Sequence, residues 1–232
     1  MIVYGRNPVR EALRGRRRVS EVWATTGAAR EPWLAGMHVQ LATGDEIAQR
    51  SGSDAHQGIC AAAGPYPYAD AAALVREPDG FLVALDEVTD PQNLGAVCRT
   101  AEVAGATGVV ICDRRAAEVT PAVCKTSAGA VEHLAVARVR NLADFLTAAK
   151  TAGAWTYGAA AEAATPYRTP DYRGAVVLVL GAEGRGLRPR VAAMCDDLVG
   201  LPVRGKLDSL NVSAAAAVLM YEILHQRLDT GS

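Results

Sequence analysis

Residues 81–112 read FLVALDEVTDPQNLGAVCRTAEVAGATGVVIC. The stretch opens and closes on short apolar runs, FLVALD and GVVIC, that are typical of buried β-strands. Between them, near residues 93–104, apolar side chains recur at helical spacing, at Leu94, Val97, Cys98, Ala101 and Ala104. A strand, a helix and a second strand in this order predict a βαβ unit with parallel strands.

The same alternation continues along the rest of the chain. Apolar runs typical of strands occupy 134–139, 154–159, 175–181 and 197–202, and helical patterns occupy 120–131, 141–152, 188–195 and 209–228. Near-continuous apolar strands that alternate with helices predict an α/β fold with a mostly parallel sheet covered on both faces. Ligands of such sheets bind beyond the carboxyl ends of the strands. Functional residues are therefore expected at that edge.

The first 63 residues predict a separate, smaller α/β unit. Asn7 and Pro8 suit the N-cap and first position of a short helix that runs to Leu13. Strands are expected at 19–25, 37–42 and 56–63, and a second helix at 45–50. The segment GPYPYADAAALVREPDG contains three prolines and is the best candidate for a linker. The predicted division is a unit at 1–63, a linker at 64–80 and a larger domain at 81–232.

The composition is that of a globular protein. The 232 residues are 50% hydrophobic and carry a net charge of −1. No run reaches the ~18 consecutive apolar residues of a membrane span. The N-terminus, MIVYGRNPVR, lacks the apolar stretch of a signal peptide. We therefore expect a cytoplasmic protein with no membrane partner.

The cysteines and histidines give no indication of a metal site. Five cysteines and four histidines are scattered, without a CxxC pair or a Cys/His cluster of metal-binding spacing. No metal is expected. We interpret the cysteines as buried thiols, at Cys60, Cys98, Cys112, Cys124 and Cys195.

Three segments carry polar residues where the predicted fold places a ligand. In the first, Asn93 stands at a predicted helix entrance and Arg99 lies off the apolar stripe, so that Arg99 points at a ligand or at water. A purely structural interpretation makes Asn93 a helix cap and pairs Arg99 with Glu102 on the surface. Spacing alone leaves both interpretations open.

The second segment, LVLGAEGRGL at 178–187, places glycines and Glu183 directly after a buried strand. Glycines let backbone N–H groups approach a ligand closely, although a tight turn explains them equally well. The pattern is neither the GxGxxG of a dinucleotide-binding fold nor a phosphate-binding P-loop. A turn needs no carboxylate, so Glu183 favours a functional site.

The third segment, LPVRGKLDSLNVSAAAAVLMYEI at 201–223, gathers Ser209, Asn211 and Ser213 at the start of the last predicted helix. Either free N–H groups there receive a ligand anion, or these side chains serve as caps. The predicted core stripe of the helix consists of Leu210, Ala214, Ala217, Val218, Tyr221 and Leu224. Further apolar residues spread around this helix, which favours a second apolar face and a homodimer through the C-terminal domain. The alternative is that both faces are buried within one chain, between the sheet and a neighbouring helix.

Together, DPQNLGAVCRTAE, LVLGAEGRGL and LPVRGKLDSLNVSAAAA resemble the three motifs of the SpoU/TrmH family of S-adenosylmethionine-dependent RNA ribose 2'-O-methyltransferases. The resemblance spans residues 81–228. It implies a SPOUT fold, in which the C-terminal part of the parallel sheet domain forms a trefoil knot, preceded by a small domain similar to ribosomal protein L30e. YGRNPVREAL and HQGICAA resemble the RNA-binding domain of members that methylate a guanosine of 23S ribosomal RNA.

Carried over residue by residue, the resemblance implies specific roles. The catalytic Asn and Arg of the first motif fall on Asn93 and Arg99, the Glu of the second on Glu183, and the Ser and Asn of the third on Ser209 and Asn211. The backbone positions that bind S-adenosylmethionine fall on Gly181, Leu201 and Leu210. Arg99 is then either the acceptor of the ribose hydroxyl proton or a group that stabilises developing negative charge.

The substrate remains open at this point. Residues 1–30 hold seven arginines against two glutamates, and guanidinium groups suit RNA phosphates, although a solvated helix face is the alternative. The arginines expected to bind RNA are Arg6, Arg10, Arg16, Arg17 and Arg18. A 23S ribosomal RNA guanosine is the expected target. The alternatives are a tRNA guanosine, the ribosomal adenosine whose methylation gives thiostrepton resistance, and a non-catalytic RNA-binding protein.

Overall fold

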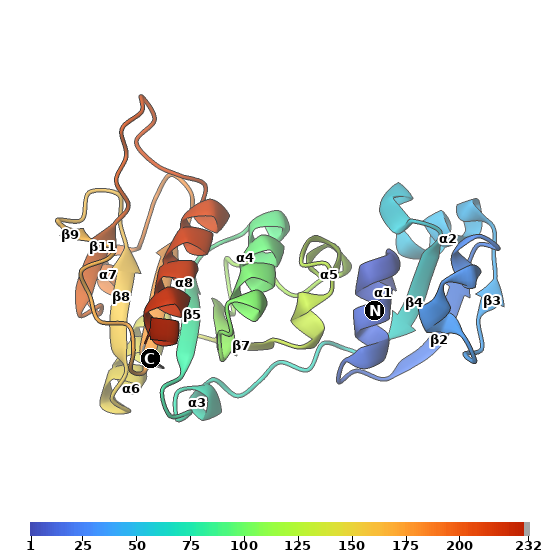
Figure 1. Ribbon diagram of the computed structural model, residues 1–232, viewed down its shortest axis with the longest axis horizontal. Coiled ribbons are helices and arrows are strands. Elements are labelled where there is room, and N and C mark those ends of the chain that lie inside the picture. Colours follow the sequence, from blue (N-terminus) through green and yellow to red (C-terminus); the bar gives the residue numbers. More distant parts are fainter. Residues whose placement is uncertain (230–232) are drawn as a thin grey trace.

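The computed structural model describes residues 1–229, and Figure 1 shows two α/β units side by side, joined by the segment 64–80. The N-terminal unit is built on a four-stranded sheet with the strand order β1-β4-β2-β3. Strand β4 is antiparallel to β1 and β2, while β3 is parallel to β2. The elements are β1 (Ile2–Tyr4), α1 (Arg6–Arg14), β2 (Val19–Ala24), β3 (Gln40–Leu41), α2 (Gly44–Ser51) and β4 (Ile59–Ala63).

Local chemistry explains where these elements begin and where they depart from the prediction. Helix α2 starts with a capping box, in which Thr43 and Glu46 satisfy each other's backbone N–H groups. The N-cap of α1 is Gly5 and not Asn7, which lies inside the helix. The strand predicted at 37–42 is shorter because the chain turns at Gly36, with a φ of +79°.

The C-terminal unit is a seven-stranded sheet with the order β7-β6-β5-β10-β8-β11-β9, and its pairings are parallel. The predicted α/β class and mostly parallel sheet are confirmed. Its strands are β5 (Phe81–Asp86), β6 (Gly108–Cys112), β7 (Ala135–Val139), β8 (Trp155–Ala159), β9 (Thr165–Pro166), β10 (Val176–Gly181) and β11 (Asp197–Gly200). Its helices are α4 (Pro91–Val103), α5 (Pro121–Thr126), α6 (Leu142–Thr151), α7 (Pro189–Ala192) and α8 (Val212–Leu228).

Both faces of this sheet are covered. Along β5, Phe81, Val83 and Leu85 pack into one core with α4, α5 and α8, whereas Leu82 and Ala84 pack into a second core with α6 and α7. Successive side chains of a strand point to opposite faces, so a strand between two helical layers must be apolar throughout. Figure 1 shows α4 and α8 beside each other on one face.

Two helix predictions need correction. The helix predicted at 120–131 ends at Thr126, because Ala128 and Gly129 adopt positive φ, and a 3-10 turn follows at Ala130–Glu132. In α8 the buried positions are Val212, Ala216, Leu219, Met220 and Ile223. The predicted core stripe was wrong, since Leu210, Val218 and Tyr221 are exposed. Apolar residues surround this helix, so their spacing does not determine which side faces the sheet.

The segment 64–80 packs against the C-terminal unit. It contains the short helix α3 (Ala71–Leu74). The Tyr66 hydroxyl donates to the carbonyl of Val131 at 2.8 Å, and the backbone N–H of Val119 donates to the Tyr68 hydroxyl at 2.9 Å. One continuous apolar core contains residues from both units. The two units are therefore firmly docked on each other.

The five cysteines form no disulfide, and four are fully buried while Cys195 is half-buried. Burial raises the pKa of the Cys98 thiol to about 12, so it stays protonated near neutral pH. The prediction of buried thiols is confirmed for these four. No helix within residues 1–229 is long and apolar enough to cross a membrane.

Candidate active site

A cavity of about 700 Å³ lies beyond the carboxyl ends of β10 and β11. Four parts of the chain line it: residues 159–162 at the end of β8, residues 180–187 around the glycine-rich turn, Ala192 of α7, and several residues between 198 and 219. Gly181, Leu201 and Leu210, expected to bind the cofactor, are all among the lining residues. The volume is in the range of sites that hold drug-sized ligands.

The turn after β10 forms one wall of the cavity and requires glycine at its start. The N–H of Gly186 donates to the carbonyl of Ala182 at 2.9 Å, which closes the turn. A β-carbon on Gly181 would lie 2.1 Å from the carbonyl carbon of Gly186, well inside van der Waals contact. Gly181 is therefore set by the close approach of two backbone segments.

An ion pair between Asp86 and Arg188, which was not predicted from the sequence, holds the far end of this turn. Asp86, the buried last residue of β5, accepts the Arg188 backbone N–H at 2.8 Å and its Nε at 2.7 Å. The hydrogen bond that Arg188 donates to Asp86 raises the pKa of Arg188, which also lies 3.0 Å from Glu87. The signal in the sequence was a carboxylate that ends an otherwise apolar strand, FLVALD.

The three motifs meet at a polar cluster beside the cavity, formed by Asn93, Glu183 and Asn211. The Asn93 Nδ2 donates to Glu183 Oε1 at 3.2 Å, and the Asn211 Nδ2 donates to Asn93 Oδ1 at 3.0 Å and to Glu183 Oε1. Asn93 is buried, and Glu183 and Asn211 line the cavity. Residues 118 positions apart thus share one hydrogen-bond network.

Both interpretations of Asn211 hold at once, because its side chain has two ends. Its Oδ1 caps α8 by accepting the N–H of Ser213 at 2.8 Å, while its Nδ2 enters the polar cluster. For α4 the capping interpretation fails: Asp90 is the N-cap and accepts the N–H of Gln92, so the Asn93 side chain is left for the cluster.

The structure does not bring Arg99 or Ser209 into the cluster. Arg99 is exposed on α4, and within residues 1–229 its guanidinium makes neither a hydrogen bond nor an ion pair. The surface pair with Glu102 is therefore not formed. Ser209 lines the cavity, but its hydroxyl donates to Asp208 at 3.1 Å.

The N-terminal arginines are less available than their number suggests. Arg6 lies 2.8 Å from Glu31, and Arg10 lies 2.7 Å from Glu11. Arg16 and Arg18 are exposed, and their guanidinium groups have no hydrogen bond or ion pair in the part of the chain that the structure describes.

The structure corrects the prediction that Arg17 binds RNA. Its side chain is 2% exposed and is paired with Glu132 of the C-terminal unit, whose side chain is 1% exposed. Arg17 is therefore not free to bind RNA. The charge at residue 17 is paired inside the protein because the side chain turns inward between the units.

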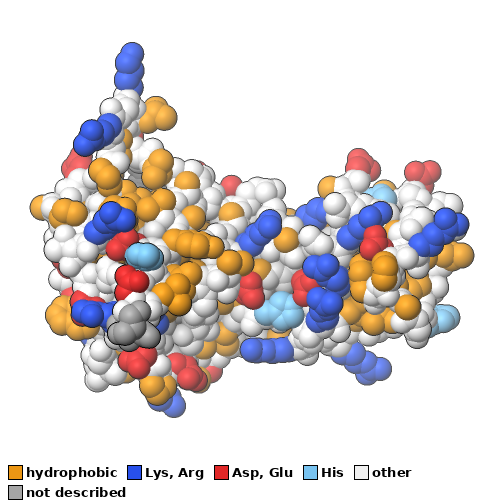
Figure 2. Space-filling view, viewed as in Figure 1, with side chains coloured by type: hydrophobic (Ala, Val, Ile, Leu, Met, Phe, Trp, Pro, Cys, Tyr) orange, Lys and Arg blue, Asp and Glu red, His pale blue; other side chains and the backbone are white. Residues whose placement is uncertain are grey.

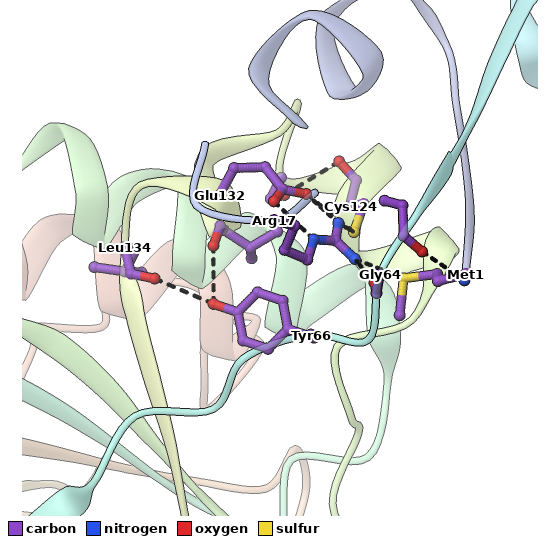
Figure 3. Close-up of polar contacts among 10 residues, drawn as sticks. Met1, Arg17, Gly64, Tyr66, Cys124, Glu132 and Leu134 are labelled. Atoms are coloured by element: carbon purple, nitrogen blue, oxygen red, sulfur yellow. Dashed lines mark hydrogen bonds and ion pairs between the residues drawn. The ribbon is translucent and has the colours of Figure 1, made fainter. Parts of the chain in front are cut away.

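Figure 3 shows this buried junction, in which the Arg17 guanidinium reaches several acceptors. Its Nε donates to Glu132 Oε2 at 2.9 Å, a second nitrogen donates to Glu132 Oε1, and Nη1 donates to the carbonyl of Gly64 at 3.2 Å. Burial alone would lower the pKa of Arg17, but the hydrogen bond and charge of Glu132 outweigh burial and raise it. The guanidinium stays charged and fixes both units to each other.

No cluster of three His, Cys, Asp or Glu side chains within residues 1–229 is arranged to hold a metal ion.

Family models match both units. A model of the SpoU rRNA Methylase family matches residues 80–221, and a model for RNA 2'-O ribose methyltransferase substrate binding matches residues 2–69. The putative TrmH family tRNA/rRNA methyltransferase YacO of Bacillus subtilis is 38% identical over 242 residues, which cover 99% of this chain and 97% of that protein. The uncharacterized tRNA/rRNA methyltransferase slr0955 of Synechocystis is also 38% identical, over 97% of this chain, and the alignment covers 62% of that protein.

Solved structures agree with this relationship. The AdoMet-bound rRNA methyltransferase from Sinorhizobium meliloti superposes with a TM-score of 0.81 at 26% identity, covering 97% of this chain and 86% of that chain. The SpoU methyltransferase AviRb from Streptomyces viridochromogenes gives a TM-score of 0.83 at 25% identity, covering 99% of this chain and 90% of that chain. With its three motifs joined at one cavity and both family models matched, this chain belongs to the SpoU rRNA methylase family.

Proposed function

We propose that this protein transfers a methyl group from S-adenosylmethionine to a ribose 2'-hydroxyl of RNA. The observation that carries the proposal is the convergence of Asn93, Glu183 and Asn211, one from each motif, beside a cavity of about 700 Å³. Methyl transfer needs in-line approach of the hydroxyl and exclusion of water, so positioning supplies much of the rate. A rigid polar cluster beside a ligand cavity suits that task.

The cavity fits S-adenosylmethionine. Backbone groups of the 181–187 turn and of residues 201 and 210 line it, and these offer a purine the donors and acceptors it needs. The lining residues include three carboxylates and one arginine, a balance that favours a positively charged ligand: Glu162, Glu183, Asp208 and Arg185. When bound, the cofactor supplies an electrophilic methyl group on a sulfonium.

The position of each residue in the site indicates its role. Asn93 and Asn211 hold the Glu183 carboxylate in one orientation at the cavity. Arg99 lies outside the cavity with an unpaired guanidinium among the described residues, so it is free to contact the phosphate or hydroxyl oxygen of the nucleotide. A guanidinium is protonated at neutral pH, so stabilisation of developing negative charge is the role that its chemistry supports.

We further propose a guanosine of 23S ribosomal RNA as the target. The support is the likeness of the N-terminal unit to a substrate-binding domain and the rRNA methyltransferases among the structural relatives. The test is incubation of the purified chain with tritiated S-adenosylmethionine and either a 23S ribosomal RNA transcript or a tRNA transcript, followed by mapping of 2'-O-methyl positions. Methylation of tRNA alone would reject the ribosomal target, and RNA binding without any methylation would reject the enzyme.

Replacing Gly181 with alanine is expected to weaken binding of S-adenosylhomocysteine about tenfold or more, because the added carbon overlaps the backbone of Gly186 and the turn must move. Isothermal titration measures the dissociation constant. The matched control is Gly174→Ala, where a β-carbon meets nothing within 4 Å and φ is not positive. Unchanged affinity in Gly181→Ala would mean that the cofactor does not bind against this turn.

We also propose a homodimer through the C-terminal unit. Val103 of α4 and Val218 and Tyr221 of α8 are 60%, 42% and 49% exposed. Figure 2 shows hydrophobic side chains gathered over α8 and its boundary with α4. A contiguous apolar face on neighbouring helices favours association with a second copy through a two-fold interface. Such an interface also lies near Arg99, which shares α4 with Val103.

Tyr221→Glu is expected to convert the dimer to a monomer, because it places a charge in the centre of this apolar face. Sedimentation equilibrium at micromolar concentration measures the mass. Leu41→Glu is the control, since Leu41 is 68% exposed but lies in the N-terminal unit. A wild-type monomer that still methylates RNA would refute the dimer as a functional requirement.

A further inference from the structure

At the junction, the side chain of Lys125 in the C-terminal unit lies against the backbone of Gly5 in the N-terminal unit. A β-carbon placed on Gly5 would lie 2.6 Å from Nζ of Lys125 and 3.1 Å from Oε1 of Gln57. Gly5 also has a φ of +95°, which other residues rarely adopt. Space and backbone conformation therefore both require glycine here, and three segments distant in sequence converge at one point.

The Lys125 ammonium has no partner at this point. Among residues 1–229 it makes neither a hydrogen bond nor an ion pair. Burial lowers its pKa, and no carboxylate offsets that effect. The nearby arginines differ, since Arg6 and Arg10 each lie within 3 Å of a glutamate. Lys125 is thus a partly desolvated cation that the protein itself leaves unneutralised.

The side-chain amide of Gln57 adds N–H donors beside Lys125 that have no acceptor in the described chain. Its Oε1 accepts the backbone N–H of Arg6 at 3.1 Å, which commits the oxygen and leaves Nε2 without a hydrogen bond in the described chain. Gln57 holds a left-handed backbone conformation, with a φ of +56°. Non-glycine residues in this strained backbone conformation are concentrated at functional sites. The ammonium and the amide together offer donors with no anion of the protein to receive them.

Helix α5, which carries Lys125, lies between α4 and the N-terminal unit (Figure 1). Thr126, next to Lys125, donates its hydroxyl to the carbonyl of Pro91 at 3.2 Å, and Pro91 begins the helix that carries Asn93. Arg14, at the other end of α1, is eight residues from Arg6, or about 12 Å along the helix. The exposed Arg16 and Arg18 follow that far end. Lys125 thus lies at one end of α1, and exposed arginines lie at the other.

We propose that Gly5, Gln57 and Lys125 form a binding site for one phosphate of the RNA backbone, between the active site and the N-terminal unit. An RNA phosphodiester fits because it is an anion with several acceptor oxygens and no donor. Gly5 leaves room for the Lys125 ammonium against the backbone, Lys125 supplies the charge, and Gln57 supplies an amide. The inference rests on RNA as the substrate, as proposed above.

The test is the affinity of the full chain for a fluorescein-labelled 23S ribosomal RNA transcript, measured by anisotropy over a series of salt concentrations. Lys125→Gln is expected to weaken binding about tenfold, as for loss of one charge-assisted contact. The slope of log K against log salt is expected to become shallower by roughly 0.7 to 0.9, the value for one phosphate. Lys125→Arg is expected to retain most of the affinity.

Two further variants separate a phosphate contact from a structural role. Gln57→Glu places a carboxylate beside Lys125, so RNA affinity is expected to fall while the melting temperature does not. Arg76→Gln, an exposed cation after α3, is expected to leave affinity and slope unchanged. If wild type binds the transcript and Lys125→Gln matches it in both affinity and slope, the phosphate site is wrong and the methyltransferase proposal stands. If wild type binds neither this transcript nor tRNA, the proposed function itself fails.

Discussion

Replacing Arg99 with alanine is expected to lower the single-turnover rate of RNA methylation about 10²- to 10³-fold, as for loss of one preorganised group that stabilises charge. Arg99 is exposed and unpaired in residues 1–229, so its guanidinium is available to the nucleotide. It does not line the cavity, so the dissociation constant of S-adenosylhomocysteine is expected to stay unchanged. Rapid-quench assays with tritiated S-adenosylmethionine and excess enzyme measure the rate.

Two control variants test whether the effect is specific to the charge and position of Arg99. Arg99→Lys keeps the charge but loses the two-pronged geometry of the guanidinium, so a partial rescue would indicate that charge matters most. Arg173→Ala removes an exposed arginine that is paired with Asp171 in the loop before β10, at the opposite edge of the sheet from the cavity. That variant is expected to react at the wild-type rate. An Arg99→Ala protein with more than half of the wild-type rate would remove Arg99 from the mechanism.

Replacing Glu132 with alanine is expected to lower the free energy of unfolding by about 3–5 kcal/mol, because it strands a buried guanidinium. Arg17 and Glu132 are 2% and 1% exposed, so water cannot replace the lost carboxylate without opening the junction. Urea unfolding measures the change as a lower midpoint at unchanged m-value. A loss below about 1 kcal/mol would show that water enters the junction and solvates Arg17.

The matched controls concern the same junction. The double variant Arg17→Met with Glu132→Leu removes both charges and is expected to be close to wild type in stability, since no buried charge is left unpaired. His133→Gln removes the neighbouring hydrogen bond between the His133 ring and Glu11, at 2.9 Å, whose histidine is 38% exposed. Because that pair is partly solvated and Glu11 keeps Arg10 and Arg14, the loss is expected to be under about 1 kcal/mol.

The alternation of apolar strands with helices was enough to predict the parallel sheet of residues 81–200. Buried strands such as FLVALD have no polar face, and that pattern survives in a single sequence because both faces are covered. The resemblance of the three motifs likewise located Asn93, Glu183 and Asn211, since the residues that carry the chemistry stand in short segments of recognisable spacing.

The same patterns did not predict which face of α8 is buried, nor that the Arg17 side chain is buried. A helix with apolar residues on all sides gives no periodic signal, so Leu210, Val218 and Tyr221 were placed inward although they are exposed. A run of arginines likewise looks like an exposed basic surface. Only the docking of the two units shows that Arg17 turns inward to Glu132, 115 residues away, while its neighbours Arg16 and Arg18 remain outside.

The sequence by itself therefore determined the α/β class, the strand and helix order and the identity of the polar cluster, because these depend on local pattern and on short motifs. The tertiary structure alone decided which charges are paired, which helix face is buried and where the Lys125 ammonium is left unneutralised. The physical reason is that pairing and burial depend on contacts between segments far apart in the chain. Their energies are set by desolvation at the place where those segments meet.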